Sequence, residues 1–516
     1  MTAPKELELK LALPPASLAR LGQLPLVRKL KDKPERTSEV SVYFDTPKQK
    51  LRKHGVMLRV RRIGDRYIQT IKSDGRNGLI ARNEWEADIP APEPDLDLAA
   101  GTALEPLISR KLRAKLKPVF ETRVARTVYP IVDREREIEL TVDRGTIDAG
   151  DRSAPLCEVE LELARGEEAD LFRFAREVAE AVPAQLAFRS KAERGYALID
   201  DARDAPVKSV PIHLARDMTA RAAFQAIVRA CLKQVVDNEA ALLKGEADGV
   251  HQMRVGLRRL RAAMSLFREL LDDSGTDAVK RQLKWVAGAL TPARELDVLK
   301  SQVLAPVKRV DARPRGSGLP DFSRALEAEH KKAYGRARGA VSSERFRTLS
   351  LDVAAWIETG AWTKPADDLI RARGERPVEM WAAEQLDRRW KKVRKKGRAL
   401  DKLDAASRHK LRIQGKKLRY AAEFFDGAFR GKRARKRHGQ FTAALKDLQD
   451  CLGVLNDVTV HEDRLVAMGV RRADASRKRA FAAGLLTGRE MVRYDAAIKA
   501  ARKAFAELAE VKPFWR

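Results

Sequence analysis

Strict alternation between apolar and charged residues dominates the first third of the chain. Residues 5–11 read KELELKL, so that Glu6, Glu8 and Lys10 alternate with leucines. A β-strand sends successive side chains to opposite faces, and the pattern therefore predicts one apolar face and one charged face. Similar segments follow at residues 39–46, 56–63, 66–72, 82–89, 120–131, 137–143 and 157–163. Turn sequences such as SDGRNG separate the segments, which predicts an antiparallel sheet or barrel of about eight strands.

The second part of the chain follows a helical period instead. Stretches rich in Ala, Leu, Arg and Lys dominate after residues 201–212, which read as a linker, DARDAPVKSVPI. We therefore predict an α+β protein of two domains. The sheet with flanking helices occupies residues 1–200, and an all-helical domain occupies residues 213–510.

The positive charge of the chain is concentrated in the part that follows the helical period. Of the net charge of +30, residues 1–200 contribute +3 and residues 201–516 contribute +27. A basic half of this size predicts a polyanionic partner, which could be nucleic acid, a membrane surface or polyphosphate.

Other features bound the cellular setting. The chain has no run of 18 apolar residues, so a membrane span is not expected. The opening MTAPKELELKL lacks the pattern of a secretory signal. The three cysteines, Cys157, Cys231 and Cys451, lie far apart and offer no metal-knuckle spacing, which is typical of reduced thiols in a cytoplasm.

The charged face of the predicted sheet has two interpretations. On any single strand, charge alternation indicates a solvated outer face. However, acids and bases recur together on nearly every strand, and an inward-facing set would need pairing or a charged ligand and metal. Alternate carboxylates can hold Mg²⁺ or Mn²⁺, while Arg and Lys opposite them can hold phosphate oxygens. This second interpretation predicts metal-assisted phosphoryl transfer to water.

These residues resemble a known family. The segments ELELK (6–10), YFDT (43–46), LRVR (58–61), IK (71–72), EVELE (158–162) and SKAERG (190–195) are similar to the CYTH domain of the triphosphate tunnel metalloenzymes. The resemblance spans roughly residues 1–200. It implies an eight-stranded antiparallel tunnel barrel that binds a triphosphate and one or two divalent metals, Mg²⁺ or Mn²⁺.

The resemblance also implies roles for individual residues. The implied catalytic residues are Glu6, Glu8 and Lys10. The implied metal ligands are Glu6, Glu8, Asp143, Glu158 and Glu160. The implied phosphate-binding residues are Lys10, Arg59, Arg61, Lys72, Arg82, Arg123 and Lys191. Glu84 and Glu86 would orient basic residues or contact metal. Arg123 and Arg126 are three apart and cannot share a face of a regular strand, so we expect either a bulge or a single inward arginine.

The basic half contains an internal repeat. Residues 251–267, HQMRVGLRRLRAAMSLF, align without gaps with residues 409–425, HKLRIQGKKLRYAAEFF. At about 100° per residue, each copy places a histidine and three basic residues on one helix face. The two stripes are His251, Arg254, Arg258 and Arg261, and His409, Arg412, Lys416 and Arg419. A single basic stripe usually indicates a solvated helix face, but an identically spaced pair led by histidine favours a site.

This half resembles the CHAD domain, a helical module that often follows CYTH in one chain. The resemblance rests on the two stripes and covers about residues 213–510. It implies duplicated four-helix bundles, at about 213–310 and 375–510, whose stripes bind long-chain inorganic polyphosphate. Because histidines titrate near neutrality, the stripes predict tighter binding as the pH falls toward 6.

Three functions compete at this point. The first is a divalent-metal-dependent inorganic triphosphatase, which converts triphosphate to diphosphate plus phosphate, with a polyphosphate-binding helical domain. The second is a non-enzymatic protein associated with polyphosphate or nucleic acid. The third is an adenylate cyclase, since the tunnel family includes cyclases. An aromatic content of 6% argues against base stacking and makes nucleic acid the weaker partner. We expect a cytoplasmic protein without membrane attachment, with polyphosphate granules as one place of association.

Overall fold

The computed structural model describes residues 5–28, 33–73, 81–215, 217–308, 318–470 and 476–516. Its internal packing divides the chain into two compact units. The first, called the sheet unit here, comprises residues 1–207, 232–244 and 342–363. The second, called the helical unit, comprises residues 208–231, 245–341 and 364–516. Among the described residues, no helix has the length and apolar character that crossing a membrane would require.

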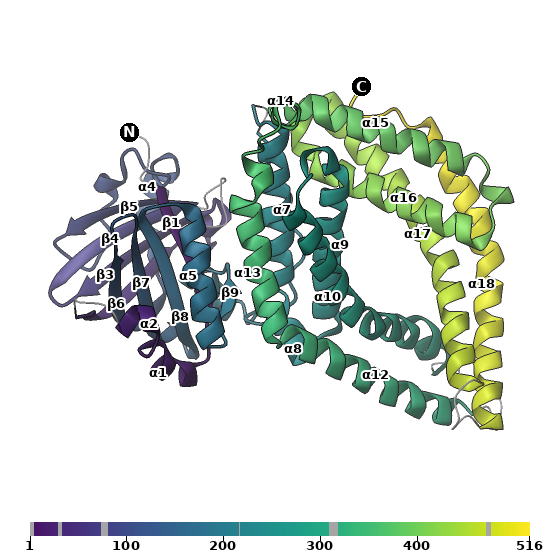
Figure 1. Ribbon diagram of the computed structural model, residues 1–516, viewed down its shortest axis with the longest axis horizontal. Helices are drawn as coiled ribbons and strands as arrows, with labels where there is room; N and C mark the ends of the chain where they lie inside the picture. Colours follow the sequence, from purple (N-terminus) through teal and green to yellow (C-terminus); the bar gives the residue numbers. More distant parts are fainter. Residues whose placement is uncertain (1–4, 29–32, 74–80, 216, 309–317, 471–475) are drawn as a thin grey trace. The chain divides into compact units, whose positions relative to one another are not determined.

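The sheet unit is built on one antiparallel sheet of nine strands (Figure 1). The strands are β1 (Lys5–Ala12), β2 (Glu35–Asp45), β3 (Val56–Ile63), β4 (Arg66–Ser73), β5 (Ala81–Ile89), β6 (Lys117–Val132), β7 (Glu137–Ala149), β8 (Arg152–Arg165) and β9 (Gln185–Ala187). Their order is β5-β4-β3-β2-β6-β7-β8-β1-β9, and β1 also pairs with β5. That extra pairing closes β1 to β8 into a ring and leaves β9 as a short addition beside β1. The predicted antiparallel sheet is confirmed.

Apolar side chains cover the outside of the ring. Helix α5 (Glu168–Ala181) packs on β1 and β8, and Figure 1 shows it lying along β8. Leu9 and Leu11 of β1 are buried with the apolar face of this helix. On the β3–β4 side, a second core joins strand residues such as Val60 to Leu96 and Leu112 of the following segment. Because each strand alternates, its charged residues must face the interior of the ring.

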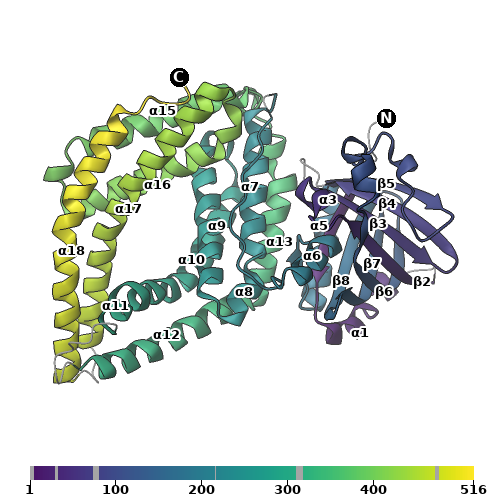
Figure 2. The same cartoon turned by 180° about the vertical axis from the view of Figure 1, so that it is seen from behind.

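One end of the interior is apolar and is covered by α6 (Lys191–Ile199). This helix packs against β6, β7 and β8 (Figure 2). Tyr43 stacks on Phe120 with ring centroids 4.4 Å apart, and Tyr196 of α6 meets Phe120 edge-on at 5.3 Å. Gly195 allows the close approach, because a Cβ at this position would lie 2.2 Å from the Phe120 ring. The charged part of the interior therefore begins beside the first turn of α6.

The helical unit repeats four helices in the same order. The first set is α7 (Ala220–Val236), α9 (Ala247–Leu266), α10 (Ser274–Val298) and α12 (Leu319–Val341). The second set is α15 (Val378–Gly397), α16 (Ala405–Phe424), α17 (Lys432–Gly469) and α18 (Arg477–Glu510). Phe267 and Phe425, which end the two aligned segments, contact each other with ring centroids 5.8 Å apart. The predicted helical half is confirmed.

Two segments from the helical half of the sequence pack with the sheet unit. One, residues 232–244, contains the end of α7 and α8 (Glu239–Lys244), and the other, residues 342–363, contains α13 (Glu344–Thr359). Helix α13 packs against α5 and β9. Helix α7 therefore begins in the helical unit and ends in the sheet unit. The remaining short helices are α1 (Leu18–Leu21), α2 (Pro25–Arg28), α3 (Lys50–Lys53), α4 (Arg110–Arg113), α11 (Ala305–Lys308) and α14 (Asp368–Gly374).

Candidate functional site

The register of β1 against β8 brings the first charged residues together inside the ring. Glu8 pairs with Glu162, Lys10 with Glu160, and Ala12 with Glu158. Glu8 and Lys10 are each only 8% exposed, although both carry charged side chains. The Lys10 ammonium bonds to the carboxylates of both Glu8 and Glu160. The charged face of the opening strand thus lines the interior.

Three carboxylates form a compact buried cluster beside Lys10. Asp143 of β7 and Glu158 and Glu160 of β8 each offer one oxygen, and these oxygens lie within 4.8 Å of one another. The Nζ atom of Lys191, the first residue of α6, lies 2.7 Å from all three carboxylates. Arg126 of β6 donates two hydrogen bonds to Asp143, at 2.8 and 2.7 Å, and one to Glu160 at 3.1 Å. The cluster is therefore enclosed by cations.

The surrounding cations favour the ionised forms of Glu160 and Asp143. Burial alone would raise the pKa of Glu160, but Lys10, Lys191 and Arg126 outweigh burial and hold that pKa well below its ordinary value. The pKa of Asp143 is lowered in the same way against burial, mainly by Lys191 and Arg126. Conversely, burial would lower the pKa of Lys191, but the three carboxylates hold it well above its ordinary value.

The opposite wall of the ring, formed by β3, β4 and β5, is richer in arginine and lysine. Arg59 lies 3.7 Å from Glu84 and 3.6 Å from Glu86. Arg61 pairs with Glu86 at 2.9 Å, and Lys72 pairs with Glu84 at 2.5 Å. The two glutamates thus lie against basic side chains, as the orienting role would require. A wall of held guanidinium and ammonium groups suits the oxygens of a phosphate chain.

The predicted residues do not all lie in this interior. Arg123 points outward, with its side chain 64% exposed and bonded to Glu121. Arg123 therefore does not lie in the interior as its predicted phosphate-binding role requires, and Arg126 faces Asp143 across the β6–β7 pair instead. No bulge occurs at this point of β6, so the regular alternation of the strand admits only one of the two arginines.

Glu6 and Arg82 pair through their backbones where β1 meets β5. Their side chains lie outside the described part of the structure.

Three interior residues, Arg126, Glu39 and Arg194, have no role among those predicted from the sequence. Glu39 of β2 lies 3.6 Å from Arg61 and 3.7 Å from Arg126. Arg194 of α6 donates to Glu158 at 3.0 Å. Glu39 begins the alternating segment EVSVYFDT and could have been found from its parity with Ser41 and Tyr43, whereas Arg194 lies on a helix without that signal.

The carboxylate cluster fits a hard divalent cation. Three buried carboxylates with oxygens close enough to share one ion match the oxygen ligands that Mg²⁺ and Mn²⁺ take. The basic wall opposite matches the substrate phosphates that such ions usually bring with them. The side chains of the interior are therefore of the kinds that bind a divalent metal and phosphate oxygens.

In the helical unit, the two basic stripes meet. Arg258 of α9 donates a hydrogen bond from Nε to the Tyr420 hydroxyl of α16 at 2.6 Å. Burial, then Arg412 and Arg258, lower the pKa of Lys416 to about 7. Burial and Arg258 lower the pKa of Arg254 to about 10. These cations crowd one another, which disfavours their charged forms in the absence of an anion.

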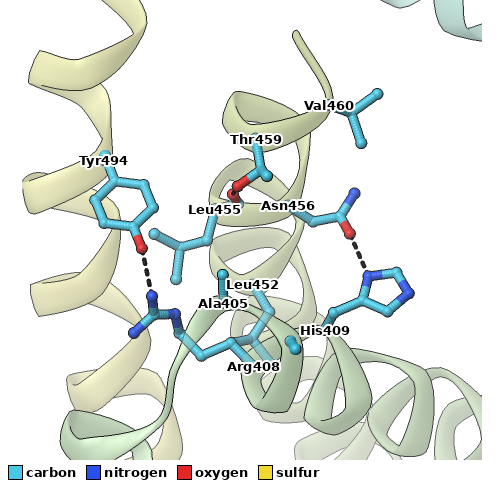
Figure 3. Close-up of a pocket in the computed structure, with 10 residues that line it drawn as sticks. Ala405, Arg408, His409, Leu452, Leu455, Asn456, Thr459, Val460 and Tyr494 are labelled. Carbon is cyan, nitrogen blue, oxygen red and sulfur yellow. Dashed lines mark hydrogen bonds between the residues drawn. The ribbon is translucent and has the colours of Figure 1, made fainter. Parts of the chain in front are cut away.

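The leading histidines of the two stripes have different surroundings. Burial, then Arg294 and Arg258, lower the pKa of His251 to about 4. His409 is exposed, and its Nδ1 hydrogen-bonds to the amide oxygen of Asn456 (Figure 3). The expectation that both histidines titrate near neutrality is therefore wrong for His251, because the sequence shows neither its burial nor the nearby Arg294.

A pocket of about 250 Å³ lies beside His409, between α16, α17 and α18. Figure 3 shows its apolar wall of Leu452 and Leu455, with Arg408 bonded to the Tyr494 hydroxyl.

The outer members of the stripes are less enclosed. Arg261 is exposed, and Arg419 pairs with Glu423 at 3.3 Å.

The chain combines a closed antiparallel sheet that has a charged interior with a duplicated helical unit that has basic stripes. Two known protein families match these two parts. The chain matches the model of the CYTH domain over residues 4–196 and the model of the CHAD domain over residues 226–466. It therefore carries a CYTH domain followed by a CHAD domain.

Individual relatives match parts of the chain. An inorganic triphosphatase of Haemophilus influenzae is 30% identical over 198 residues, which cover 38% of this chain and 55% of that protein. The chain thus spans about half the length of this relative. The solved CHAD domain of the plant Ricinus communis is 29% identical, covers 58% of this chain and 96% of its own, and gives a TM-score of 0.50.

A more distant solved structure comes from Hippeastrum, and its description names both an adenylyl cyclase and a dominant triphosphatase activity. It is 18% identical, covers 37% of this chain and 95% of its own, and gives a TM-score of 0.30.

Proposed function

We propose that the sheet unit is a divalent-metal-dependent inorganic triphosphatase, which cleaves triphosphate to diphosphate and phosphate. The observation that carries the proposal is the buried carboxylate cluster of Asp143, Glu158 and Glu160, enclosed in the same ring as a wall of arginines and lysines. The CYTH match and the triphosphatase relative support the same class of reaction.

In this proposal, Asp143, Glu158 and Glu160 hold Mg²⁺ or Mn²⁺. The bound ion would neutralise phosphate charge and make the attacking water more acidic. The phosphate oxygens are bound by Lys10, Arg59, Arg61, Lys72, Arg126 and Lys191. The carboxylates paired with these side chains keep them in position before substrate arrives.

Glu8 lies buried beside Lys10 at the edge of the cluster and accepts the proton of the attacking water. The phosphoryl group is thereby transferred to water, with diphosphate as the leaving group. Glu6 and Arg82 stay in the proposal as a further acid and base at the β1–β5 junction.

Hydrolysis of inorganic triphosphate by the full chain should require a divalent metal. We expect phosphate release in Mg²⁺ or Mn²⁺ and none in excess EDTA. Without a divalent ion, the buried carboxylates would repel the negatively charged triphosphate, and no metal would activate the attacking water. The measurement is phosphate release from triphosphate, thiamine triphosphate and ATP, with chromatography of the ATP products. Activity that survives EDTA would contradict the metal role, and cyclic AMP as the main ATP product would make the chain a cyclase.

We further propose that the helical unit, within the predicted boundaries of 213–510, binds long-chain inorganic polyphosphate. The two basic stripes meet at Arg258, Arg412 and Lys416, whose positive charges repel one another. A bound anion would offset this repulsion. A linear anion without bases suits this surface, because contacts to phosphate carry no sequence information. Two linked stripes should also hold a long chain more tightly than a short one. Cytoplasmic polyphosphate granules would be one place to find the protein.

Binding of polyphosphate should weaken as the pH rises above about 7, the pKa of Lys416. Burial lowers this pKa most. Arg412 and Arg419 on the same helix and Arg258 on α9 lower it further, while Asp457 on α17 raises it. Polyphosphate favours the ammonium form, so below pH 7 the lysine is already charged and the full affinity is present. Above pH 7 binding must take up a proton, and the affinity should fall by up to about tenfold per pH unit.

The measurement for this prediction is the Kd for polyphosphate at fixed ionic strength from pH 6 to pH 9. Replacement of Lys416 by Arg should flatten the profile, since the guanidinium keeps its charge throughout this range. A Kd that stays constant from pH 6 to pH 9 in the unchanged protein would contradict the role of Lys416.

A further inference from the structure

The first turn of α6 has two functional faces. Lys191 and Arg194 point toward the carboxylate cluster, where they contact Glu158 at 2.7 and 3.0 Å. Arg189 and Glu193 lie on the other side and face the end of α7. The position of Lys191 in the site therefore depends on the contacts that Arg189 and Glu193 make with the end of α7.

These contacts are made by Lys233 in the last turn of α7 and by Asp237 directly after it. The Lys233 ammonium lies between the carboxylates of Glu193, at 3.4 Å, and Asp237, at 3.1 Å. Arg189 donates from Nη2 to the Asp237 carbonyl oxygen at 3.1 Å, and its Nε lies 3.8 Å from the Asp237 carboxylate. The Asp237 side chain is only 5% exposed, so its contacts with Arg189 and Lys233 are partly shielded from water, whereas the Lys233–Glu193 contact is more open, with side chains 38% and 46% exposed.

The same contacts set where α6 begins. Glu193 accepts a hydrogen bond from the Ser190 backbone N–H at 2.8 Å, while its own N–H donates to the Ser190 hydroxyl at 3.1 Å. This reciprocal pair is a capping box, which fixes the start of a helix. Lys191 follows directly as the first helical residue. Lys233 therefore holds the carboxylate that caps the helix from which Lys191 extends.

We propose that Lys233 and Asp237 are positioning residues for Lys191 in the triphosphatase site. The inference rests on the function proposed for the sheet unit. Both residues come from the end of α7, outside residues 4–196 that match the CYTH model, and act on a lysine inside that match. They form the α7 clamp, which consists of Lys233 and Asp237 with their partners Arg189 and Glu193.

A positioning role and a merely structural role predict opposite effects on metal binding. The Lys191 ammonium lies 2.7 Å from the three carboxylates that would hold the ion, so it competes with a divalent cation for them. Release of the clamp should free Lys191 and reduce this competition, while the phosphate chain loses a well-placed cation. Metal affinity should then rise as kcat falls, whereas general loosening of the fold would lower both.

The test uses the full chain with Asp237→Ala and Lys233→Met. We expect kcat for triphosphate to fall about tenfold with little change in KM, as small misplacements of a binding group do. We expect Mn²⁺, titrated by electron paramagnetic resonance, to bind about threefold more tightly once the competing charge is released. Acylation of Lys191 by an activated ester, followed by peptide mass spectrometry, should become faster.

The matched control is Asp352→Asn. It removes an ion pair between α13 and Arg176 of α5 in the same unit but away from α6. All three measurements should stay at their original values. Asp237→Glu should restore part of the activity, and thermal melting will show whether each variant is folded.

The outcomes separate the two proposals. If the unchanged protein hydrolyses no triphosphate, the proposed function fails, but Lys191 acylation still tests the clamp. Unchanged Lys191 acylation in the folded Asp237 and Lys233 variants would overturn the clamp. Weaker Mn²⁺ binding together with lower kcat would also overturn it, since that result assigns Asp237 to the fold alone.

Discussion

Replacement of Glu160 by Gln should reduce triphosphate hydrolysis at least about 100-fold, the loss that follows damage to a metal's ligand shell. Glu160 accepts from Lys10, Lys191 and Arg126 and belongs to the carboxylate cluster. The amide keeps the shape of the side chain but removes the charge that both the metal and the lysines require. The measurement is kcat/KM for triphosphate in saturating Mg²⁺ or Mn²⁺.

The control for this variant lies on the same sheet. Glu121→Gln changes an outward-facing carboxylate that pairs with Arg123, and it should leave kcat/KM unchanged. Loss of one partner from a buried ion pair can cost about 3–5 kcal/mol of stability, so circular dichroism must show that the Glu160 variant is folded. If that variant unfolds, Glu8→Gln provides the second test at the edge of the cluster. Full activity in either folded variant would refute the assignment.

Charge reversal at the meeting point of the stripes should abolish most polyphosphate binding. Arg258→Glu with Lys416→Glu places two carboxylates where two cations now crowd each other. We expect the Kd to rise at least about 100-fold, because each lost contact also removes a counterion-release contribution. The control is Arg433→Glu with Lys436→Glu, two exposed residues of α17 outside the stripes. This pair changes the net charge equally and should have a much smaller effect.

A milder variant separates binding from folding. Lys416→Met removes a cation whose pKa burial and neighbouring arginines lower to about 7, so the free protein should become more stable. A gain of ~1 kcal/mol would raise Tm by about 2–4 °C. Polyphosphate binding should weaken in the same variant. Loss of both stability and binding would instead make Lys416 part of the core and contradict its assignment to the anion site.

Nucleic acid supplies the critical competitor in these experiments. Duplex DNA and RNA should bind less tightly than polyphosphate at equal charge and salt, because the stripes match a chain of phosphates without bases. Equal affinity for all three anions would make the helical unit a general cation surface. The salt dependence of each Kd reports how many phosphates are neutralised.

Alternation in the sequence predicted the antiparallel strands, while the closure of the sheet and its charged interior were implied by the resemblance to the CYTH domain. A period of two assigns each side chain to a face, and the strand predicted from KELELKL is present as β1, where Glu8 and Lys10 share the interior face. Its pairing with β8 was not predicted. The short strand β9 was missed, because the three residues QLA carry no alternation. The choice between Arg123 and Arg126 needed the exact register of β6 against β7, which the sequence does not contain.

Helical periodicity was less informative about partners than about structure. It located the repeated helices and the two stripes, but it did not show that residues 232–244 and 342–363 pack with the sheet unit. An amphipathic helix shows that it has an apolar face, not which surface that face covers. The environment of His251 was hidden for the same reason, since Arg294 lies on another helix. The boundaries at residues 200 and 213 stay a prediction.

The composition of the sheet unit from three separate chain segments bears on how this protein can be shortened or recombined. Helix α13 buries Phe346, Leu349 and Val353 and packs on α5 and β9. A gene fragment that stops at residue 200 would leave that surface of α5 bare and would lack both Lys233 and Asp237. Exchange of CYTH modules between proteins by a cut in the linker would therefore transfer an incomplete sheet unit. The smallest fragment that contains the whole sheet unit must include residues 232–244 and 342–363, which lie within the match to the CHAD model.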